Sequence, residues 1–280
     1  MPLSVKGIDH FVIRVADLDA GEQLFQRLGF TLTPRGFHVG RGSANHTAPL
    51  SSGNYFELIY LPPGADSSPF ASRSEGPVAL ALEPTDSRTI HAELTALGYE
   101  IEPPRDLSRP VHLPSGARDA RFLNASFPSI APEAVRFFTC QHLTRDLVWR
   151  PEWERHANGA DRVVEVIVAY PAPADLRATY AKLYGEAAIH VDADRLVVTL
   201  GEDKISFLSP AAFKTRFPGI PVPGDLSKGW FAGAALRVRS LDTVAKILSE
   251  AGIAAVRTSS GSLVVPPSQA ADTLLEFKAA

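Results

Sequence analysis

One arrangement of residues occurs four times along the chain, and this repeat constrains the fold more than any other feature of the sequence. An apolar run typical of a strand is followed by apolar residues at helical spacing, and a glycine ends the helical pattern. In the first copy the run covers residues 8–15 and the pattern ends at Gly29. The other copies begin at residues 78–82, 163–169 and 234–238 and end at Gly98, Gly185 and Gly252, with glycine spacings of 69, 87 and 67 residues.

Strand-like segments follow each glycine, so each unit is predicted to contain one strand, one helix and three further strands. They are residues 31–33, 45–50 and 55–61, then 120–127 and 135–140, then 187–191, 195–200 and 204–208, and finally 254–257, 262–265 and 273–277. A unit of this kind carries its helix on one face of the sheet, and two units joined edge to edge would curl around a cavity. We therefore predict an α+β fold in which four units pair into two domains, residues 1–142 and 162–280, joined by a linker at 143–161.

Charge and cysteine content exclude several classes of function. With 28 basic and 31 acidic residues the net charge is −3, and no stripe of Lys and Arg could neutralise a run of phosphates, so nucleic acid is not an expected partner. No apolar run approaches the roughly 18 residues that cross a bilayer, and residues 1–6 lack the apolar stretch of a secretory signal. The single cysteine, Cys140, cannot form an internal disulfide. We expect a cytoplasmic protein without a membrane partner, and whether it forms a homodimer stays open.

Two strand motifs, combined with the four units, give the chain a resemblance to a known family. The first strand reads Ile8-Asp9-His10-Phe11-Val12, and the last strand of the first unit contains Tyr55-Phe56-Glu57-Leu58. In this combination the chain resembles the vicinal oxygen chelate superfamily, specifically its glyoxalase-like domain proteins, a group that includes glyoxalases, bleomycin resistance proteins and extradiol dioxygenases. The resemblance implies a cavity where the first and fourth strands supply ligands to a divalent metal ion, which chelates two neighbouring oxygens of a small-molecule substrate. The site motifs match only in the first half of the chain.

His10 is the first candidate ligand. Strict alternation along the strand places His10 and Arg14 on one face, and Asp9 and Phe11 on the other face, which should pack against the helix. His10 then faces the cavity, where a neutral imidazole can bind a divalent ion. The alternative is a core histidine that is hydrogen-bonded to a backbone carbonyl.

Glu57 is the second candidate ligand, and the resemblance also implies a catalytic role for it. It lies in an otherwise apolar strand, and a carboxylate taken from water without a partner costs several kcal/mol, so a cation should meet it. A metal ion would serve. The competing partner is Arg14, whose position in the alternation also directs it inward, so a buried ion pair between Glu57 and Arg14 is the alternative interpretation.

A third ligand is harder to place, because the strand at residues 76–80 carries no ligand where the family pattern expects one. The last strand of the second unit places Phe138, Cys140 and His142 on one face, so that His142 could complete the set near the strand end. Two histidines and one carboxylate with open positions suit Fe(II), Mn(II) or Zn(II), and nickel is a further option. The alternative is that His142 is only a residue of the strand end or linker.

Six further residues are candidates for contact with the substrate. Arg14, Tyr55, Phe138 and Cys140 share the inward faces of their strands, His46 lies on the third strand facing either the cavity or solvent, and Trp149 belongs to the linker. Trp149 could cover a bound substrate or hold the two domains together.

The second half of the chain is poor in ligands, and we expect its domain to be a degenerate, structural one. The position corresponding to His10 is Val164 in the third unit, and only Glu276 in the fourth unit keeps a carboxylate like that of Glu57.

These observations predict a metal-dependent enzyme acting on a small molecule in the N-terminal cavity. The metal would act as a Lewis acid on two adjacent substrate oxygens, and the resemblance to glyoxalase-type proteins implies isomerase or lyase chemistry. The first alternative is a metal-free protein that sequesters a small molecule, as resistance proteins of the same superfamily do. An extradiol-type dioxygenase is the second alternative, although the family's dioxygenases carry their ligands in the C-terminal half.

Overall fold

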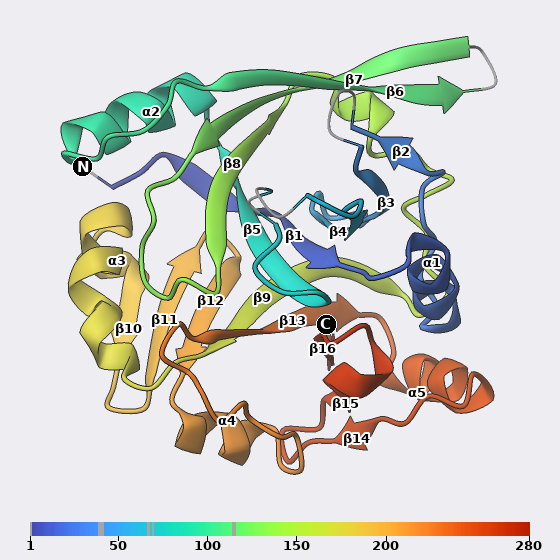
Figure 1. Ribbon diagram of the computed structural model, residues 1–280. Helices are drawn as coiled ribbons and strands as arrows, with labels where there is room; N and C mark the ends of the chain where they lie inside the picture. The colour runs from blue at the N-terminus through green and yellow to red at the C-terminus, as the bar shows by residue number, and fades with distance from the viewer. Residues whose placement is uncertain (1, 39–41, 66–67, 69, 114–115) are drawn as a thin grey trace.

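Two sheets of eight strands each organise the chain (Figure 1). The computed structural model describes residues 2–38, 42–65, 68, 70–113 and 116–280. The strand order is β2-β3-β4-β1-β5-β8-β7-β6 in the first sheet and β10-β11-β12-β9-β13-β16-β15-β14 in the second, so equivalent strands occupy equivalent places. In the middle of each sheet one antiparallel pair, β1 with β5 and β9 with β13, joins the two halves of the sheet. The predicted α+β fold is confirmed.

The first sheet takes all its strands from the N-terminal half of the chain. These are β1 (Val5–Arg14), β2 (Gly36–Phe37), β3 (Ala44–Pro49), β4 (Tyr55–Tyr60), β5 (Gly76–Pro84), β6 (Arg105–Leu113), β7 (Gly116–Ser126) and β8 (Arg136–His142). Helix α1 (Leu18–Arg27) follows β1 and helix α2 (Ser87–Ala96) follows β5. Strand β6 is absent from the sequence prediction, and the strand expected at residues 31–33 does not form.

The second sheet repeats this order. Its strands are β9 (Ala160–Ala169), β10 (Ile189–Val191), β11 (Arg195–Leu200), β12 (Asp203–Leu208), β13 (Trp230–Val238), β14 (Val256–Arg257), β15 (Leu263–Val265) and β16 (Leu274–Ala279). Helix α3 (Arg177–Tyr184) follows β9 and helix α5 (Leu241–Glu250) follows β13. Helix α4 (Pro210–Arg216), between β12 and β13, is a further element that the repeat pattern does not predict.

Helix α1 shows how the local sequence sets the repeating unit. The side chain of Asp17 caps the helix by accepting a hydrogen bond from the backbone N–H of Ala20. Phe25 is fully buried against the sheet, which fixes the inward face of the helix. Gly29 has φ of +87°, a left-handed conformation that glycine adopts without strain, and the helix ends just before it. The chain can therefore turn back and enter the following strands.

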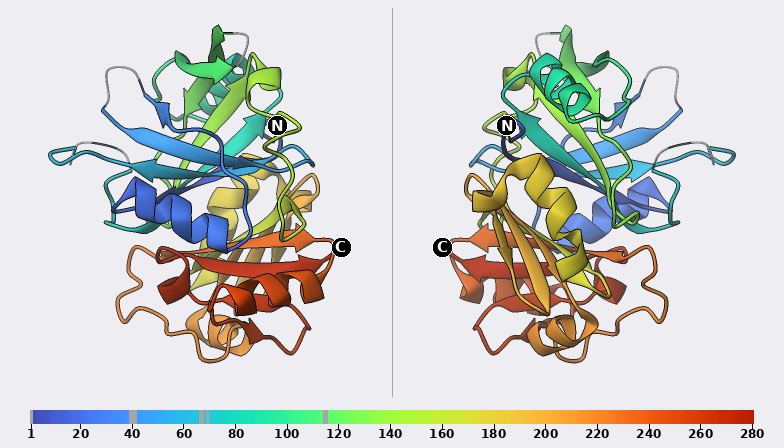
Figure 2. Two further views of the ribbon diagram at one scale, coloured as in Figure 1. Left: turned by 90° about the vertical axis from the view of Figure 1, so that its right-hand side faces the viewer. Right: turned by 90° about the vertical axis from the view of Figure 1, so that its left-hand side faces the viewer.

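The helix-covered faces of the two sheets pack against each other and share one core. Phe11 of β1 contacts Phe231 of β13 with ring centroids 6.5 Å apart, and both belong to a single buried cluster with residues of α1, α2, α3 and α5. Figure 2 shows the N-terminal half stacked on the C-terminal half in both views. The opposite faces of the two sheets therefore point away from each other, and each has to be filled separately.

The far face of the second sheet is filled by its own chain. Phe213 of α4 and Phe217 pack with Trp230 of β13 in a second buried cluster that reaches Ile167 of β9. Helix α4 therefore occupies the interior that a curled sheet would otherwise leave open. None of the described helices has the length and apolar character needed to cross a bilayer.

Candidate functional site

The far face of the first sheet encloses a cavity of about 100 Å³. Its wall combines polar and aromatic side chains from β1, β3, β4, β6, β7 and β8, so the sheet curls around it. The lining residues are His10, His38, Asn45, Thr47, Tyr55, Glu57, Phe70, Leu107, Ser108, Arg109, Phe122, Asn124, Phe138 and Cys140. Polar groups that converge in an otherwise apolar pocket are the usual form of a small-molecule site.

A β-bulge at Asp9 brings two consecutive side chains of β1 into the region of the site. Ile8 pairs with Leu82 and His10 pairs with Ala81, so Asp9 has no partner across the strand pair. The extra residue interrupts the alternation of faces. The prediction that Asp9 faces the helix is wrong for this reason, because its carboxylate contacts the ring of His10 instead.

Asp9 is a fully buried carboxylate shared by two imidazoles. Its Oδ1 atom accepts a hydrogen bond from His10 Nδ1 at 2.5 Å and another from His142 Nε2 at 3.1 Å. Burial raises the pKa of Asp9, but the charge of His142 and the hydrogen bonds from both histidines outweigh it and hold the pKa well below its usual value. Asp9 is therefore ionised, and both nitrogens that face it carry hydrogen.

The bond to Asp9 leaves the other nitrogen of His10 directed at Glu57. Because Nδ1 donates to Asp9, Nε2 is the nitrogen of His10 that is left to act as a ligand, and it lies 3.7 Å from Glu57 Oε2. The ring is stacked on Tyr55 at a centroid distance of 4.3 Å and meets the edge of Phe138 at 5.4 Å. A carboxylate that fixes the tautomer and orientation of an imidazole is a common arrangement behind metal-binding histidines.

Glu57 is held by polar side chains within the cavity wall. Its side chain is 10% exposed, and Oε1 accepts a hydrogen bond from Asn45 Nδ2 at 2.6 Å. His38, which follows β2, places Nε2 at 3.8 Å from the same Oε1. The ion pair with Arg14 that the sequence offered as an alternative does not form, because the guanidinium of Arg14 donates to the backbone carbonyl of Arg73. His10, Glu57 and His38 thus converge as two imidazoles and one carboxylate.

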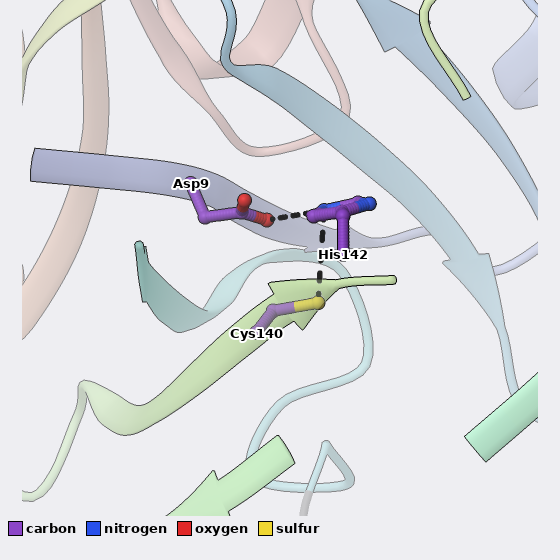
Figure 3. Close-up of side chains that lie close together, drawn as sticks. All are labelled: Asp9, Cys140 and His142. Carbon is purple, nitrogen blue, oxygen red and sulfur yellow. Dashed lines mark hydrogen bonds and ion pairs between the residues drawn. The ribbon is translucent and has the colours of Figure 1, made fainter. Parts of the chain in front are cut away.

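A second group that could hold a metal ion consists of Asp9, Cys140 and His142 (Figure 3). One ligand atom of each lies within 4.8 Å of the others, and Cys140 Sγ is 3.7 Å from His142 Nε2. Burial raises the pKa of the Cys140 thiol, and the charges of Asp9 and Glu57 raise it further. The group therefore joins a protonated thiol to a nitrogen that donates to Asp9 Oδ1, and Asp9 Oδ2 and His142 Nδ1 are buried without a hydrogen-bond partner among the described residues.

The chemistry of the donor atoms separates these two groups. His142 Nε2, the nitrogen that faces Asp9 and Cys140, donates its hydrogen to Asp9 and has no lone pair for an ion between them, while the unpartnered nitrogen of His142 is Nδ1. His10 Nε2 is the nitrogen that is not bonded to Asp9, and it lies 3.7 Å from the carboxylate of Glu57 in the cavity wall. Donor atoms 3 to 4 Å apart leave room for an ion that lies roughly 2 Å from each. The residues of the cavity therefore fit a divalent metal ion, with His10 and Glu57 as the central pair.

The structure divides the other candidate residues into those that reach the cavity and those that do not. Tyr55, Phe138 and Cys140 line it. Trp149 lies outside the lining and packs on His142 at a centroid distance of 4.7 Å, while its indole N–H donates to the carbonyl of Leu50. This contact ties the linker to the first sheet.

His46 and Arg14 also lie outside the cavity lining. His46 is buried on the helix side of β3, where Nδ1 donates to the Thr33 carbonyl and Nε2 lies 3.5 Å from Glu22 of α1. Asn45 and Thr47, its neighbours in the strand, take the cavity side. Alternation along β3 therefore places Asn45 and Thr47 on the cavity face and His46 on the helix face.

Several residues of the cavity lining were not among the sequence candidates, and four of them bear on the chemistry of the site: His38, Asn45, Arg109 and Asn124. Arg109 lies on β6, whose polar sequence and internal Pro110 give no apolar alternation. Asn45 follows from the alternation of β3 once one face is known to carry the helix. His38 has no signal of this kind, because it follows a two-residue strand.

A family model described as glyoxalase-like domain matches residues 8–184, which is more than half of the chain. No curated protein matches the sequence.

Solved structures share the fold over nearly the whole chain at low sequence identity. A hypothetical protein from Staphylococcus aureus aligns with a TM-score of 0.68 at 11% identity, covering 98% of this chain and 99% of that protein. A mutant of 4-hydroxymandelate synthase from Streptomyces coelicolor aligns with a TM-score of 0.59 at 15% identity, covering 100% of this chain and 93% of that protein. The Mn(II)-bound glyoxalase from Novosphingobium aromaticivorans aligns with a TM-score of 0.56 at 12% identity, covering 99% of this chain and 82% of that protein. The chain therefore belongs to the glyoxalase-like domain family of the vicinal oxygen chelate superfamily.

Proposed function

We propose that this protein is a metal-dependent enzyme that acts on a small molecule in the N-terminal cavity, with isomerase or lyase chemistry. The observation that carries the proposal is the pairing of His10 Nε2 with Glu57 Oε2 at 3.7 Å, while Asp9 holds the opposite nitrogen of the same ring. His10 and Glu57 would hold the ion. His38 takes the place of third ligand in this proposal, because His142 donates to Asp9.

A bound divalent ion would supply Lewis acidity to two adjacent oxygens of the substrate. Glu57 is the residue placed to move a proton, because Asn45 holds Oε1 and leaves Oε2 directed into the group around His10. Tyr55 stacks on the His10 ring and Phe138 contacts it edge-on, and with these contacts His10 is 3% exposed and shielded from water. Burial raises the pKa of Tyr55, so its hydroxyl stays protonated and can donate a hydrogen bond.

Metal-free sequestration remains the second candidate function, and one observation favours it. Strand β5, which crosses the centre of the sheet beside β1, offers only Val78, Ala79, Leu80 and Ala81 where the family resemblance implies a ligand. A pocket with His10, Glu57 and aromatic walls could bind a ligand without any metal. A dioxygenase with its centre in the C-terminal half is disfavoured, because Glu165 and Glu276 are already paired there with Arg216.

The test is metal binding by protein purified without chelator. We expect close to one equivalent of Fe, Mn, Zn or Ni by elemental analysis, and stoichiometric Mn(II) binding by the apo-protein in calorimetry. H10A and E57Q should lose this binding, and H38A should weaken it at least 10-fold. The matched controls are C140A and H142A, which each remove one member of the neighbouring group and leave the side chains of His10, Asp9 and Glu57 in place.

Each outcome has a definite meaning. Loss of the metal in C140A and H142A, with H38A unaffected, would move the site to Asp9, Cys140 and His142. No metal under any loading condition would favour the sequestering function. Proton transfer by Glu57 predicts that the Mn(II) protein exchanges hydrogen for deuterium at a carbon next to a carbonyl, which proton NMR in D₂O detects in a panel of 2-hydroxy and 2-oxo compounds.

A further inference from the structure

Arg109 is a buried cation in the wall of the cavity. It lies on β6, is 8% exposed, and shares its strand face with Leu107 and Val111. Gly36 makes room for the guanidinium, because a Cβ atom there would lie 3.2 Å from Arg109 Nη1 and 2.4 Å from Asn45 Oδ1. The guanidinium is therefore lodged beside the amide that holds Glu57.

Arg109 has no counterion within the described part of the chain. Neither a hydrogen bond nor an ion pair to its guanidinium occurs among those residues. Among the described residues of the lining, Glu57 is the one carboxylate, and it bonds to Asn45 and faces His10 and His38. If Glu57 binds a metal ion, its negative charge is neutralised by that ion and not by Arg109. Arg109 is then a desolvated cation that needs an anion as its partner.

Other lining groups narrow the identity of that anion. Phe70, Phe122 and Phe138 provide apolar walls around the same space. Asn124 Oδ1 is buried and has no hydrogen-bond donor among the described residues, so it can accept a hydrogen from a ligand. The cavity of about 100 Å³ suits a planar carboxylate with a short apolar body, and a guanidinium matches a carboxylate with two parallel hydrogen bonds.

We propose that the substrate of this cavity is a small carboxylic acid whose carboxylate pairs with Arg109 and whose apolar body lies among Phe70, Phe122 and Phe138. This inference rests on the proposed function, since it assigns the substrate class of the same site. Arg109 is thus the residue that selects acids over their neutral analogues. Asn124 then selects acids that also carry a hydroxyl or N–H group.

The test compares three acids with their neutral primary amides, which have nearly the same shape. The probes are acetate, benzoate and 3-phenylpropionate, each paired with its amide, and binding is measured by calorimetry with Mn(II)-loaded and metal-free protein. We expect at least one acid to bind 10-fold or more tightly than its amide. In R109Q this preference should disappear, with the amide affinity changed less than 3-fold, and R109K should retain part of it.

Controls separate the role of Arg109 from folding and from the metal. R105Q changes an exposed arginine on the same strand and should leave every affinity unchanged. Circular dichroism and Mn(II) affinity report whether R109Q is folded, and R109K serves if it is not. The proposal is overturned if no acid binds more tightly than its amide, or if folded R109Q or R109K keeps the full preference. Failure of Mn(II) binding, with the preference intact, would overturn the proposed function alone.

Discussion

Arg216 neutralises two buried carboxylates inside the second sheet, and removing its charge should destabilise the protein strongly. Its guanidinium binds both oxygens of Glu165 at 2.7 Å and one oxygen of Glu276 at 2.5 Å. Lys278 Nζ adds a contact to Glu165 at 2.8 Å. The Glu165 and Glu276 side chains are 8% and 1% exposed, so water cannot replace a lost partner.

The magnitude follows from the pKa of Glu165. Burial raises this pKa, but the hydrogen bonds and charge of Arg216, with help from Lys278, lower it from 4.5 to about 2. At about 1.4 kcal/mol per unit, this shift corresponds to about 3 kcal/mol of stability at neutral pH. Because the folded pKa is depressed, the contribution is complete above about pH 4.5 and is lost as pH falls towards 2.

We therefore expect R216Q to lower the free energy of unfolding by about 3 kcal/mol at pH 7, within the range for breaking one partner of a buried pair. Urea unfolding followed by circular dichroism measures this, and the difference from wild type should shrink between pH 5 and pH 3. R177Q is the matched control, because Arg177 pairs with Glu186 on the surface and should contribute less than about 0.5 kcal/mol.

A third variant tests the electrostatic origin of the effect. E165Q/R216M/E276Q removes the two buried carboxylates together with Arg216, and the remaining cation, Lys278, is 36% exposed and can turn to water, so most of the stability lost in R216Q should return. A loss below about 1 kcal/mol in R216Q, or a loss of equal size at pH 3 and pH 7, would refute the reasoning.

Two further predictions concern buried titratable groups. Burial lowers the pKa of His156, whose Nδ1 accepts from Thr31 N–H, so the unfolded chain binds a proton that the folded chain does not. Stability is complete above about pH 6.5 and should fall by up to about 1.4 kcal/mol per unit below it; an unchanged pH slope of urea unfolding in H156Q would contradict this. Burial also raises the pKa of Cys140, so native protein should react slowly with a disulfide reagent at pH 8 and completely in urea. Rapid reaction of the native thiol would contradict the second prediction.

The fold could be predicted from the sequence because the same spacing of apolar residues recurs in each of the four units. Strand β1, helix α1 and the closing Gly29 all follow from residue type and period, and their recurrence predicts both sheets. The facing pair of His10 and Glu57 follows from alternation, since each strand has one helix-covered face. These are short-range rules, and they hold wherever a strand is regular.

Where a strand is irregular or polar, the same rules fail. Alternation cannot detect the extra residue at Asp9, and this residue decides which nitrogen of His10 faces the cavity. Strand β6 lies at the edge of its sheet and is largely polar, so Arg109 stood in a segment without any strand prediction. Helix α4 is too short to give a clear helical period, so the sequence predicted neither the helix nor the position of Arg216 at its end. In each of these cases the structure depends on contacts with residues that are distant in the sequence: Asp9 on the pairing of β1 with β5, Arg109 on the pairing of β6 with β7, and Arg216 on its contact with Glu165.

The register of the two sheets shows why only the first is expected to bind a ligand. His10 pairs with Ala81, which pairs with Phe138, and Glu165 pairs with Ala235, which pairs with Glu276. Glu165 is therefore the counterpart of His10, and the assignment of Val164 is wrong by one residue.

The error has the same origin as the one at Asp9. Val164 is the unpaired residue of a bulge in β9, just as Asp9 is in β1. Both sheets thus place polar groups at one interior position, but with different partners. In the second sheet the chain supplies the cation itself, through Arg216 of α4. In the first sheet the Glu57 carboxylate lies near two imidazoles, and Arg109 has no counterion among the described residues, and these are the groups that we propose a metal ion and an anionic substrate to complete.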